Sequence, residues 1–154
     1  MAGLINDKSV SSVEVVESHL ERINDVNPYL NAVTVILADS AMDMARKADN
    51  SQSAGLLHGM PFSVKENIDC LGSATTLGVP AMAGAMPTRG AIVVQRMKAA
   101  GAVPISRTNL LEFALRISTA NPLHGRTMNP WHAERVAGGS SGGEASSIAS
   151  GMVR

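Results

Sequence analysis

A run of four glycines and two serines, Gly138 to Gly143 in the stretch AGGSSGGEAS, limits the folds open to this chain more than any other feature. Glycine reaches backbone conformations that other residues avoid, so the run is either a flexible linker or a backbone bent tightly around chemistry. A linker should lead into further folded sequence, whereas only eleven residues follow Gly143. The run is therefore predicted to be an ordered loop.

Two other functions for this loop fit the residues less well. A phosphate-binding nest would use backbone N–H groups at the start of a helix, but the P-loop lysine is absent and Glu144 would repel a phosphate. Gly139, Ser141 and Gly143 also match the G-x-S-x-G nucleophile elbow. That motif needs a strand before the serine and an Asp and a His after it, and neither Asp nor His follows Ser141.

The composition of the 154 residues predicts one globular domain. Hydrophobic residues make up 45% and charged residues 17%, which excludes a disordered chain. The formal net charge is zero and aromatic residues are 3%, so direct binding of nucleic acid is not expected. The sequence shows no signal peptide and no membrane span, and we expect a cytoplasmic protein that does not contact a membrane.

The cysteine and histidine content argues against disulfide and metal chemistry. The single cysteine, Cys70, excludes an internal disulfide, fits a reducing compartment and is predicted to be a small buried apolar residue. The histidines show no metal-ligand spacing, so neither a metal nor a cofactor is expected. These histidines are His19, His58, His124 and His132.

Local patterns predict an alternation of helices and strands, which is typical of α/β layering. A Ser11–Glu14 capping box begins a helix that should end at Asn27-Pro28, because proline disfavours helix at the residue before it. Further helices are expected at 36–49, 90–101 and 108–115, and another near Glu144. Thr108 or Asn109 is expected to cap the helix at 108–115. Strands are expected at 62–64 and 102–106, and an ordered loop at 71–90. Pro104 either weakens the prediction of this second strand or places the strand at a sheet edge.

Lys65 is a candidate base because it directly follows the apolar strand in PFSVKENID, where a lysine is partly buried. Burial lowers a lysine pKa and allows the neutral amine to accept a proton. The residues on their own favour a plainer alternative, in which the lysine is solvated or paired with Glu66 or Asp69.

Three segments, taken in their order and spacing, resemble the amidase signature family of serine hydrolases. They are GMPFSVKENID, GAVPISRTNLLEFAL and NPLHGRTMNPWHAERVAGGSSGGEAS, and the resemblance covers nearly the whole chain. It implies an α/β fold with a mixed β-sheet flanked by helices, of which this chain would hold the N-terminal part. The implied organisation is one C-terminally truncated domain over residues 1–154, with a helical segment at 1–56 and an α/β part at 57–154.

The resemblance also implies hydrolysis of amides through a Ser–cis-Ser–Lys triad. Lys65 would be the base, and Ser140, after a cis peptide bond from Gly139, would relay the proton. Ser141 would hydrogen-bond within the loop. The residues that the resemblance assigns to loop support or to the substrate site are Leu115, Arg116, Gly138, Gly139 and Ser141.

The resemblance places the acylating serine about two dozen residues beyond the relay serine, which here would fall after Arg154. Residues 1–154 would then contain no nucleophile and would be inactive alone. The implied partners are a small-molecule amide substrate and either a second copy in a homo-oligomer or the missing C-terminal part. A non-catalytic binding or scaffolding fragment, and the amidase subunit of a tRNA-dependent amidotransferase, stay open as alternatives.

Overall fold

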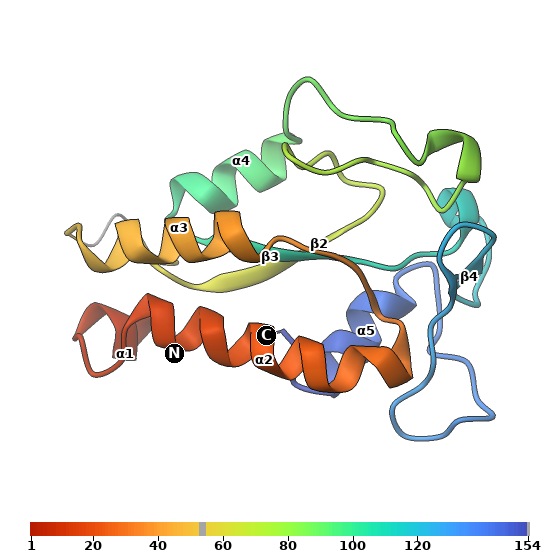
Figure 1. The fold of residues 1–154 in the computed structure, drawn as a ribbon, viewed down its shortest axis with the longest axis horizontal. Coiled ribbons are helices and arrows are strands. Elements are labelled where there is room, and N and C mark those ends of the chain that lie inside the picture. Colours follow the sequence, from red (N-terminus) through yellow and green to blue (C-terminus); the bar gives the residue numbers. More distant parts are fainter. Residues whose placement is uncertain (53–54, 154) are drawn as a thin grey trace.

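The computed structural model describes residues 1–52 and 55–153 of the chain. A mixed three-stranded sheet forms its centre, and helices cover both faces of that sheet (Figure 1). The elements in chain order are α1 Ala2–Asn6, α2 Ser12–Leu30, β1 Val33–Ile36, α3 Ala38–Asp49, β2 Pro61–Lys65, α4 Ile92–Ala99, β3 Val103–Thr108, β4 Ala120–Asn121, β5 Gly125–Arg126 and α5 Gly142–Ala149. Single 3₁₀ turns lie at Pro80–Met82 and Glu112–Ala114.

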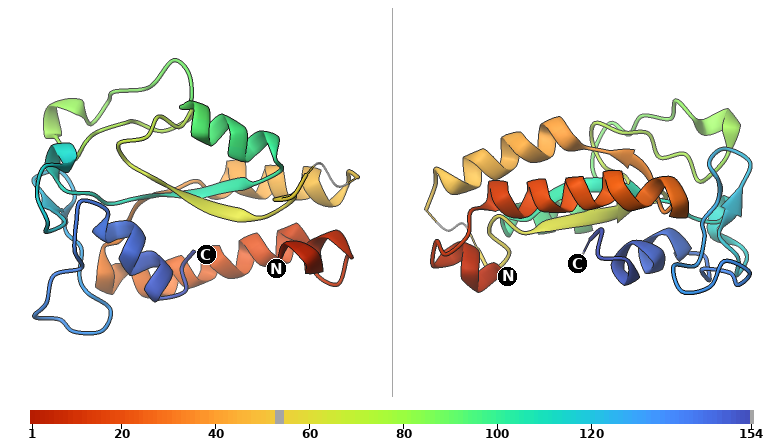
Figure 2. Two further views of the ribbon diagram at one scale, coloured as in Figure 1. Left: turned by 180° about the vertical axis from the view of Figure 1, so that it is seen from behind. Right: turned by 60° about the horizontal axis from the view of Figure 1, so that its bottom comes forward.

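Strand β3 lies in the middle of the sheet, with β1 antiparallel on one side and β2 parallel on the other. Helix α4 covers one face, whereas α2 and α5 lie on the opposite face, as Figures 1 and 2 show. Helix α3 packs against α2 and β3. This arrangement confirms the predicted α/β class with a mixed sheet between helices.

The described residues form two apolar clusters against the sheet. The larger cluster joins α2, α3, β1 and β3, and its members Ile23 and Ile105 are fully buried. The smaller cluster joins β2 and α4 through Val64, Val94 and Cys70. Cys70 is buried and forms no disulfide, so its predicted place as a small apolar core residue is confirmed.

Helix α2 begins as predicted but ends later. The Ser11 side chain accepts from the backbone N–H of Glu14, and the Glu14 carboxylate accepts from the backbone N–H of Ser11, so the capping box is confirmed. The predicted end at Asn27-Pro28 is wrong, because the helix continues to Leu30 with Pro28 inside it. Proline removes one helical hydrogen bond. The Asn27 side chain offsets that loss with three hydrogen bonds to the backbone that follows the helix.

Strand β1 has no counterpart in the sequence-based prediction, which begins a helix at residue 36. Its four residues, VTVI, do not alternate strictly between apolar and polar, so the pattern does not mark a strand. Pairing with β3 from Val33 opposite Thr108 to Ile36 opposite Ser106 gives the segment its strand conformation. Because β1 lies within residues 1–56, it ties the largely helical first part of the chain to the central sheet.

The expectation that Pro104 marks a sheet edge is wrong, since β3 is the central strand. The pairing of β1 with β3 reaches only as far as Ser106, so Pro104 lies beyond the end of β1. On the other side, the register with β2 shifts directly after Phe62, the partner of Pro104. The missing N–H of proline therefore falls where the ladder is already interrupted.

The helix predicted over 108–115 is also wrong. Thr108 belongs to β3, and a single 3₁₀ turn at Glu112–Ala114 follows. Phe113 has a φ of 51°, which the right-handed helix excludes. Asn109 does not cap a helix, because its fully buried side chain bonds to the backbone N–H of Leu110 and to neighbouring loops. Tertiary hydrogen bonds have overridden the local helical pattern here.

The other predicted helices agree with the structure to within a few residues. Helix α3 occupies Ala38–Asp49 within the predicted 36–49, α4 lies within 90–101, and α5 begins at Gly142, two residues before Glu144. Across the part of the chain that the structure describes, no helix has both the length and the apolar character to cross a membrane.

Truncation of Ile23 in the core of α2 should destabilise the fold. Ile23→Ala leaves a cavity between α2 and the sheet, so we expect the free energy of unfolding to fall by about 2–5 kcal/mol in urea denaturation. The matched control is Ile148→Ala in α5, whose side chain is 54% exposed. That variant should change the free energy of unfolding by less than about 0.5 kcal/mol. Equal losses in both variants would contradict the placement of the core.

Candidate active site

The amine of Lys65 lies against the two serines of the glycine-rich loop. Lys65 is the last residue of β2, and Ser140 and Ser141 directly precede α5. The Nζ atom of Lys65 donates hydrogen bonds to Ser140 Oγ at 2.8 Å and to Ser141 Oγ at 2.7 Å. The fold thus brings together residues that the sequence assigns to one site. The hydrogen bond of Ser141 reaches across to β2 and does not stay within the loop.

The loop is ordered, and three of its glycines, Gly139, Gly142 and Gly143, have no space for a side chain. The Gly139–Ser140 peptide bond is cis, and Gly138 has a φ of +86°. A Cβ atom on Gly139 would approach the carbonyl carbon of Ile117 to 2.7 Å, closer than side-chain carbons are found. The run is therefore a closely packed segment of the fold and not a linker.

Thr119 holds both ends of this loop. Its backbone N–H and its Oγ1 hydroxyl both donate to the carbonyl of Gly138, each at 2.9 Å. Its Oγ1 also accepts from the backbone N–H of Gly142 at 2.8 Å. Sequence patterns do not identify Thr119, because it lies in a turn-rich segment and only the fold places it beside the loop.

The extended segment after β3 supports the loop from the other side. The backbone N–H of Leu111 donates to the carbonyl of Ser140 at 3.2 Å, and that of Gly143 donates to the carbonyl of Asn109 at 3.1 Å. The Asn109 side chain is fixed in turn by Asn121, whose Nδ2 donates to Asn109 Oδ1 at 2.7 Å. The departure from the predicted 108–115 helix is thus what frees this backbone to bond to the serine loop.

A cavity of about 320 Å³ opens beside Lys65, Ser141 and Glu144. Its other walls are mostly apolar side chains of β2, α4 and the residues after β2, namely Phe62, Val64, Ile68, Val93, Val94 and Met97, together with Ser63. These apolar walls remove water from one side of the lysine. Burial accordingly lowers the pKa of Lys65, and the negative charge of Glu144 opposes that fall.

Glu144 belongs to this site although the sequence does not identify it as a functional residue. Its carboxylate accepts hydrogen bonds from Ser63 Oγ at 2.5 Å and from Thr108 Oγ1 at 2.8 Å. Ser63 lies on β2 and Thr108 at the end of β3, so one side chain of α5 joins two strands. The sequence does show an acidic residue in the first turn of the helix that follows the loop. A negative charge at a helix N-terminus is favourable by itself, so this position gives no reason to assign Glu144 to the site.

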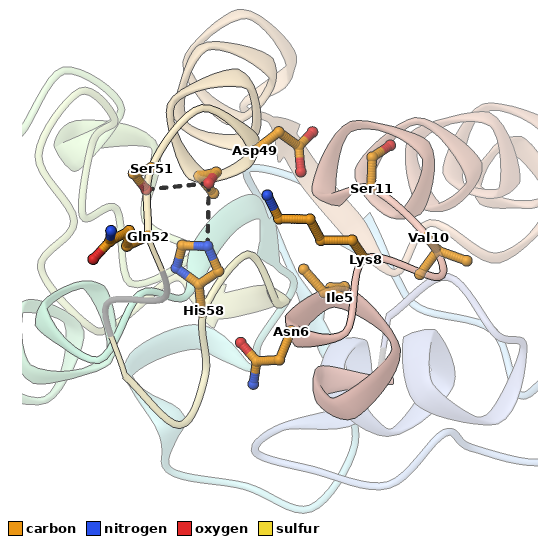
Figure 3. A pocket seen from close by; sticks show the side chains of 10 residues that line it. Ile5, Asn6, Lys8, Val10, Ser11, Asp49, Ser51, Gln52 and His58 are labelled. Atoms are coloured by element: carbon orange, nitrogen blue, oxygen red, sulfur yellow. Dashed lines mark hydrogen bonds between the residues drawn. The ribbon is translucent and has the colours of Figure 1, made fainter.

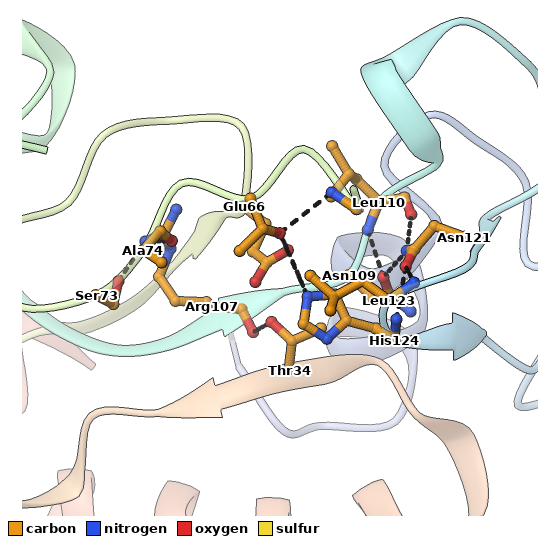
Figure 4. A network of polar contacts seen from close by, with 12 residues as sticks. Thr34, Glu66, Ser73, Ala74, Arg107, Asn109, Leu110, Asn121, Leu123 and His124 are labelled. Atoms are coloured by element: carbon orange, nitrogen blue, oxygen red, sulfur yellow. Dashed lines mark hydrogen bonds and ion pairs between the residues drawn. The ribbon is translucent and has the colours of Figure 1, made fainter. Parts of the chain in front are cut away.

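The guanidinium of Arg107 is buried and lies beside Ser73 and Ala74 (Figure 4). It also holds the chain on both sides of Lys65. Its Nε donates to the carbonyl of Val64 at 3.2 Å, and its Nη2 donates to the carbonyl of Ile68 at 2.8 Å. Its Nη1 donates to Ser73 Oγ in the loop beyond. Hydrogen bonds of this kind allow a charged group to stay buried, and here they fix the end of β2.

The carboxylate of Glu66 is fully buried and pairs with His124, not with Lys65 (Figure 4). Its Oε2 lies 2.9 Å from His124 Nε2 and accepts from Thr76 Oγ1 at 2.6 Å. Burial acts to raise the pKa of Glu66, but the hydrogen bonds from His124 and Thr76 outweigh it and hold the pKa below its ordinary value. The alternative of a Lys65–Glu66 pair is therefore not the arrangement that forms.

A second cavity, of about 360 Å³, lies between α1, the start of α2 and the end of α3 (Figure 3). Within it the carboxylate of Asp49 accepts from the backbone N–H groups of Ser12 and Val13 at 2.7 and 3.0 Å. His58 Nε2 lies 3.1 Å from the carbonyl of Ala48. Asp49 thus joins α3 to α2, and His58 joins the segment before β2 to α3. The cavity contains none of the residues predicted for the active site.

Leu115 and Arg116 have exposed side chains in the segment between the 3₁₀ turn and β4. The next residue, Ile117, is the one that packs against Gly139. The role of Leu115 and Arg116 in binding substrate through their backbone stays a prediction. Within residues 1–52 and 55–153, no group of three or more His, Cys, Asp and Glu side chains is placed to hold a metal ion.

Residues 14–154 match the family model described as Amidase. The chain belongs to this family, the amidase signature enzymes. It is 45% identical over 155 residues to the indoleacetamide hydrolase of Bradyrhizobium diazoefficiens, covering 98% of this chain and 30% of the relative. It is 43% identical over 143 residues to a glutamyl-tRNA(Gln) amidotransferase subunit from Methanococcoides burtonii, covering 93% and 30%.

The fold is similar to that of the peptide amidase from Stenotrophomonas maltophilia, with a TM-score of 0.92 and 31% identity. That comparison covers 98% of this chain and 33% of the amidase. The chain therefore spans about 30% of the length of the curated relatives it matches.

The lowered pKa of Lys65 makes a prediction about stability and pH. Between that lowered pKa and the ordinary lysine value of 10.5, the unfolded chain binds the Lys65 proton and the folded chain does not. The free energy of unfolding of the wild type should therefore rise with pH through this window, relative to Lys65→Met. Urea denaturation from neutral pH to pH 10.5 measures the difference.

The control for this measurement is Lys47→Met, which removes an exposed lysine of α3. Its pH dependence should run parallel to that of the wild type. If Lys65→Met also ran parallel to the wild type, the burial of the Lys65 amine would be contradicted.

Proposed function

We propose that this chain supplies the base and the proton relay of an amidase that hydrolyses carboxamides through an acyl-enzyme. The observation that carries the proposal is the hydrogen bond of 2.8 Å between Lys65 Nζ and Ser140 Oγ, at an amine whose pKa burial lowers. A lysine with a lowered pKa is neutral more often and accepts a proton more readily near neutral pH. Membership of the amidase family supports the same chemistry.

In the proposed reaction, neutral Lys65 accepts the proton of Ser140 while Ser140 accepts the proton of the acylating serine. The serine oxygen forms a bond to the carbonyl carbon of the substrate, and the C–N bond then breaks as the relay returns a proton to the leaving amine. Water next attacks the ester under the same base, which releases the acid and the free serine. Ser141 and the glycines Gly138 and Gly139 support the loop that holds Ser140.

The acylating serine and the oxyanion donors are proposed to come from sequence outside residues 1–154. This proposal rests on the chain's match to about 30% of its relatives' length and on the resemblance of its motifs. An enzyme that lacks its nucleophile loses nearly all covalent catalysis. We propose that the chain acts together with such a segment, in a reducing compartment such as the cytoplasm, as the single free thiol of Cys70 indicates.

The substrate class is proposed to be a small-molecule carboxamide. The 45% identity to an indoleacetamide hydrolase favours a stand-alone amidase. The 43% identity to an amidotransferase subunit supports a second candidate, in which the amide is that of glutamine and the ammonia passes to a partner. These candidates are separated by comparing the rates at which the chain, combined with a nucleophile segment, hydrolyses indoleacetamide and glutamine.

The isolated chain should show neither turnover of simple amides nor labelling by a fluorophosphonate probe that reacts with activated serines. Ammonia release and mass spectrometry of the probe-treated protein measure the two outcomes. Labelling of any serine among residues 1–154, or turnover above background, would show that the nucleophile lies within this chain and would overturn its proposed role.

A chimera tests the base and the relay directly. Residues 1–154 replace the aligned N-terminal part of the indoleacetamide hydrolase, which restores a nucleophile segment. Lys65→Ala and Ser140→Ala in this chimera should each lower kcat by about 10²–10⁴-fold, the usual contribution of acid–base catalysis. Lys47→Ala, at an exposed site on α3, is the matched control and should retain full kcat. Equal activity of the Lys65 and Lys47 variants would contradict the proposed base.

A further inference from the structure

We infer that Glu144 is a positioning residue that seats the Ser140–Ser141 loop on Lys65 by joining the start of α5 to β2 and β3. The inference rests on the proposed function, because it concerns how the proposed base and relay are held together. Glu144 itself donates or accepts no proton in that scheme.

The contacts of Glu144, on α5, reach both β2 and β3. Its two carboxylate oxygens take one hydroxyl each: Oε1 accepts from Ser63 Oγ at 2.5 Å and Oε2 from Thr108 Oγ1 at 2.8 Å. Hydrogen bonds to an ionised carboxylate are shorter and about twice as strong as neutral ones. One side chain therefore anchors α5 to both parallel strands at the end where Lys65 lies.

The pairing of the strands explains why this anchor acts on Lys65. Side chains two residues apart on a strand share a face, so Ser63 and Lys65 of β2 both project toward α5. Thr108 is the partner of Lys65 in the register of β2 with β3. The two hydroxyls that donate to Glu144 therefore belong to Ser63, two residues before Lys65, and to Thr108, the strand partner of Lys65. Any tilt of α5 away from these hydroxyls would carry Ser140 away from the Lys65 amine.

The glycines before Glu144 make the anchor necessary. Gly142 and Gly143 are buried, and a Cβ atom on either would collide with Thr119 or with the backbone of Asn109. They allow close approach but supply no side chain to hold the helix in place. Glu144 is the first residue after them whose side chain bonds to the sheet.

Charge gives Glu144 a second effect on the same amine. Burial lowers the pKa of Lys65, and the carboxylate of Glu144 acts in the opposite direction. Other charged groups near this end of β2 are Arg107 of β3, whose guanidinium donates to the Lys65 carbonyl, Glu66, which is paired with His124, and Asp69 in the residues after β2. Loss of the Glu144 charge and loss of its anchoring contacts should therefore shift the Lys65 titration in opposite directions.

The test is an NMR titration of the Lys65 side chain in the 154-residue chain, with lysine labelled with ¹³C at Cε and Lys65 assigned by the Lys65→Met variant. Glu144→Gln keeps the size and hydrogen-bonding ability of the side chain but removes the charge, so the Lys65 midpoint should move to lower pH. Glu144→Ala removes both contacts, so the loop should leave the amine, water should enter, and the midpoint should move to higher pH. Glu17→Gln, an exposed glutamate of α2, should leave it unchanged.

A midpoint that moves to lower pH in both Glu144 variants would show that the loop keeps its place without Glu144, and would overturn the inference. Unchanged midpoints in both would overturn it as well. Should Glu144→Ala fail to fold, Ser63→Ala replaces it, because that change removes one contact and keeps the charge, and the midpoint should again rise. This titration measures the ionisation of Lys65 and not enzyme activity. An inactive chimera would therefore count against the proposed function and not against the positioning role of Glu144.

Discussion

Close approach of α5 to the end of the sheet is the constraint on which the site depends. The helix begins with Gly142 and Gly143, which have no side chains and pack directly on Thr119 and Asn109. Only at that distance can Ser140, the residue two positions earlier, reach the amine of Lys65. Larger residues at the two glycines would push the helix outward and separate the serines from the lysine.

The same approach decides the electrostatics of Lys65. The amine is partly enclosed by apolar residues of β2 and α4, and this burial lowers its pKa. Glu144 arrives with the helix and opposes that effect while it bonds to Ser63 and Thr108. Behind the strand, Arg107 binds carbonyls on both sides of Lys65, so the backbone that carries the amine is held in place. The apolar residues of β2 and α4, the carboxylate of Glu144 and the guanidinium of Arg107 therefore together set the position and the pKa of Lys65.

Sequence reasoning succeeded where local chemistry decides structure. The capping box of Ser11 and Glu14, the strand before Lys65 and the helix after the glycine run all follow from nearest neighbours. It failed at β1, at Pro104 and over residues 108–115, where partners distant in sequence outweigh local preference. It also failed at Pro28, where the Asn27 side chain bonds to the backbone just after the helix. Asn109 shows the reason, because as an isolated residue it is a good helix cap, whereas in the fold its side chain is taken up by Asn121 and Thr127.

By itself the sequence determined the chemical groups of the site: a lysine after an apolar strand, and two serines between glycines that leave the backbone free to bend. It left open whether that lysine is solvated, paired with Glu66 or Asp69, or turned toward the serines. Only the tertiary structure decided this, by pairing Glu66 with His124 and placing Lys65 against Ser140. The physical reason is that a side chain's partner and burial depend on which distant segments pack beside it, and no spacing along the chain records that.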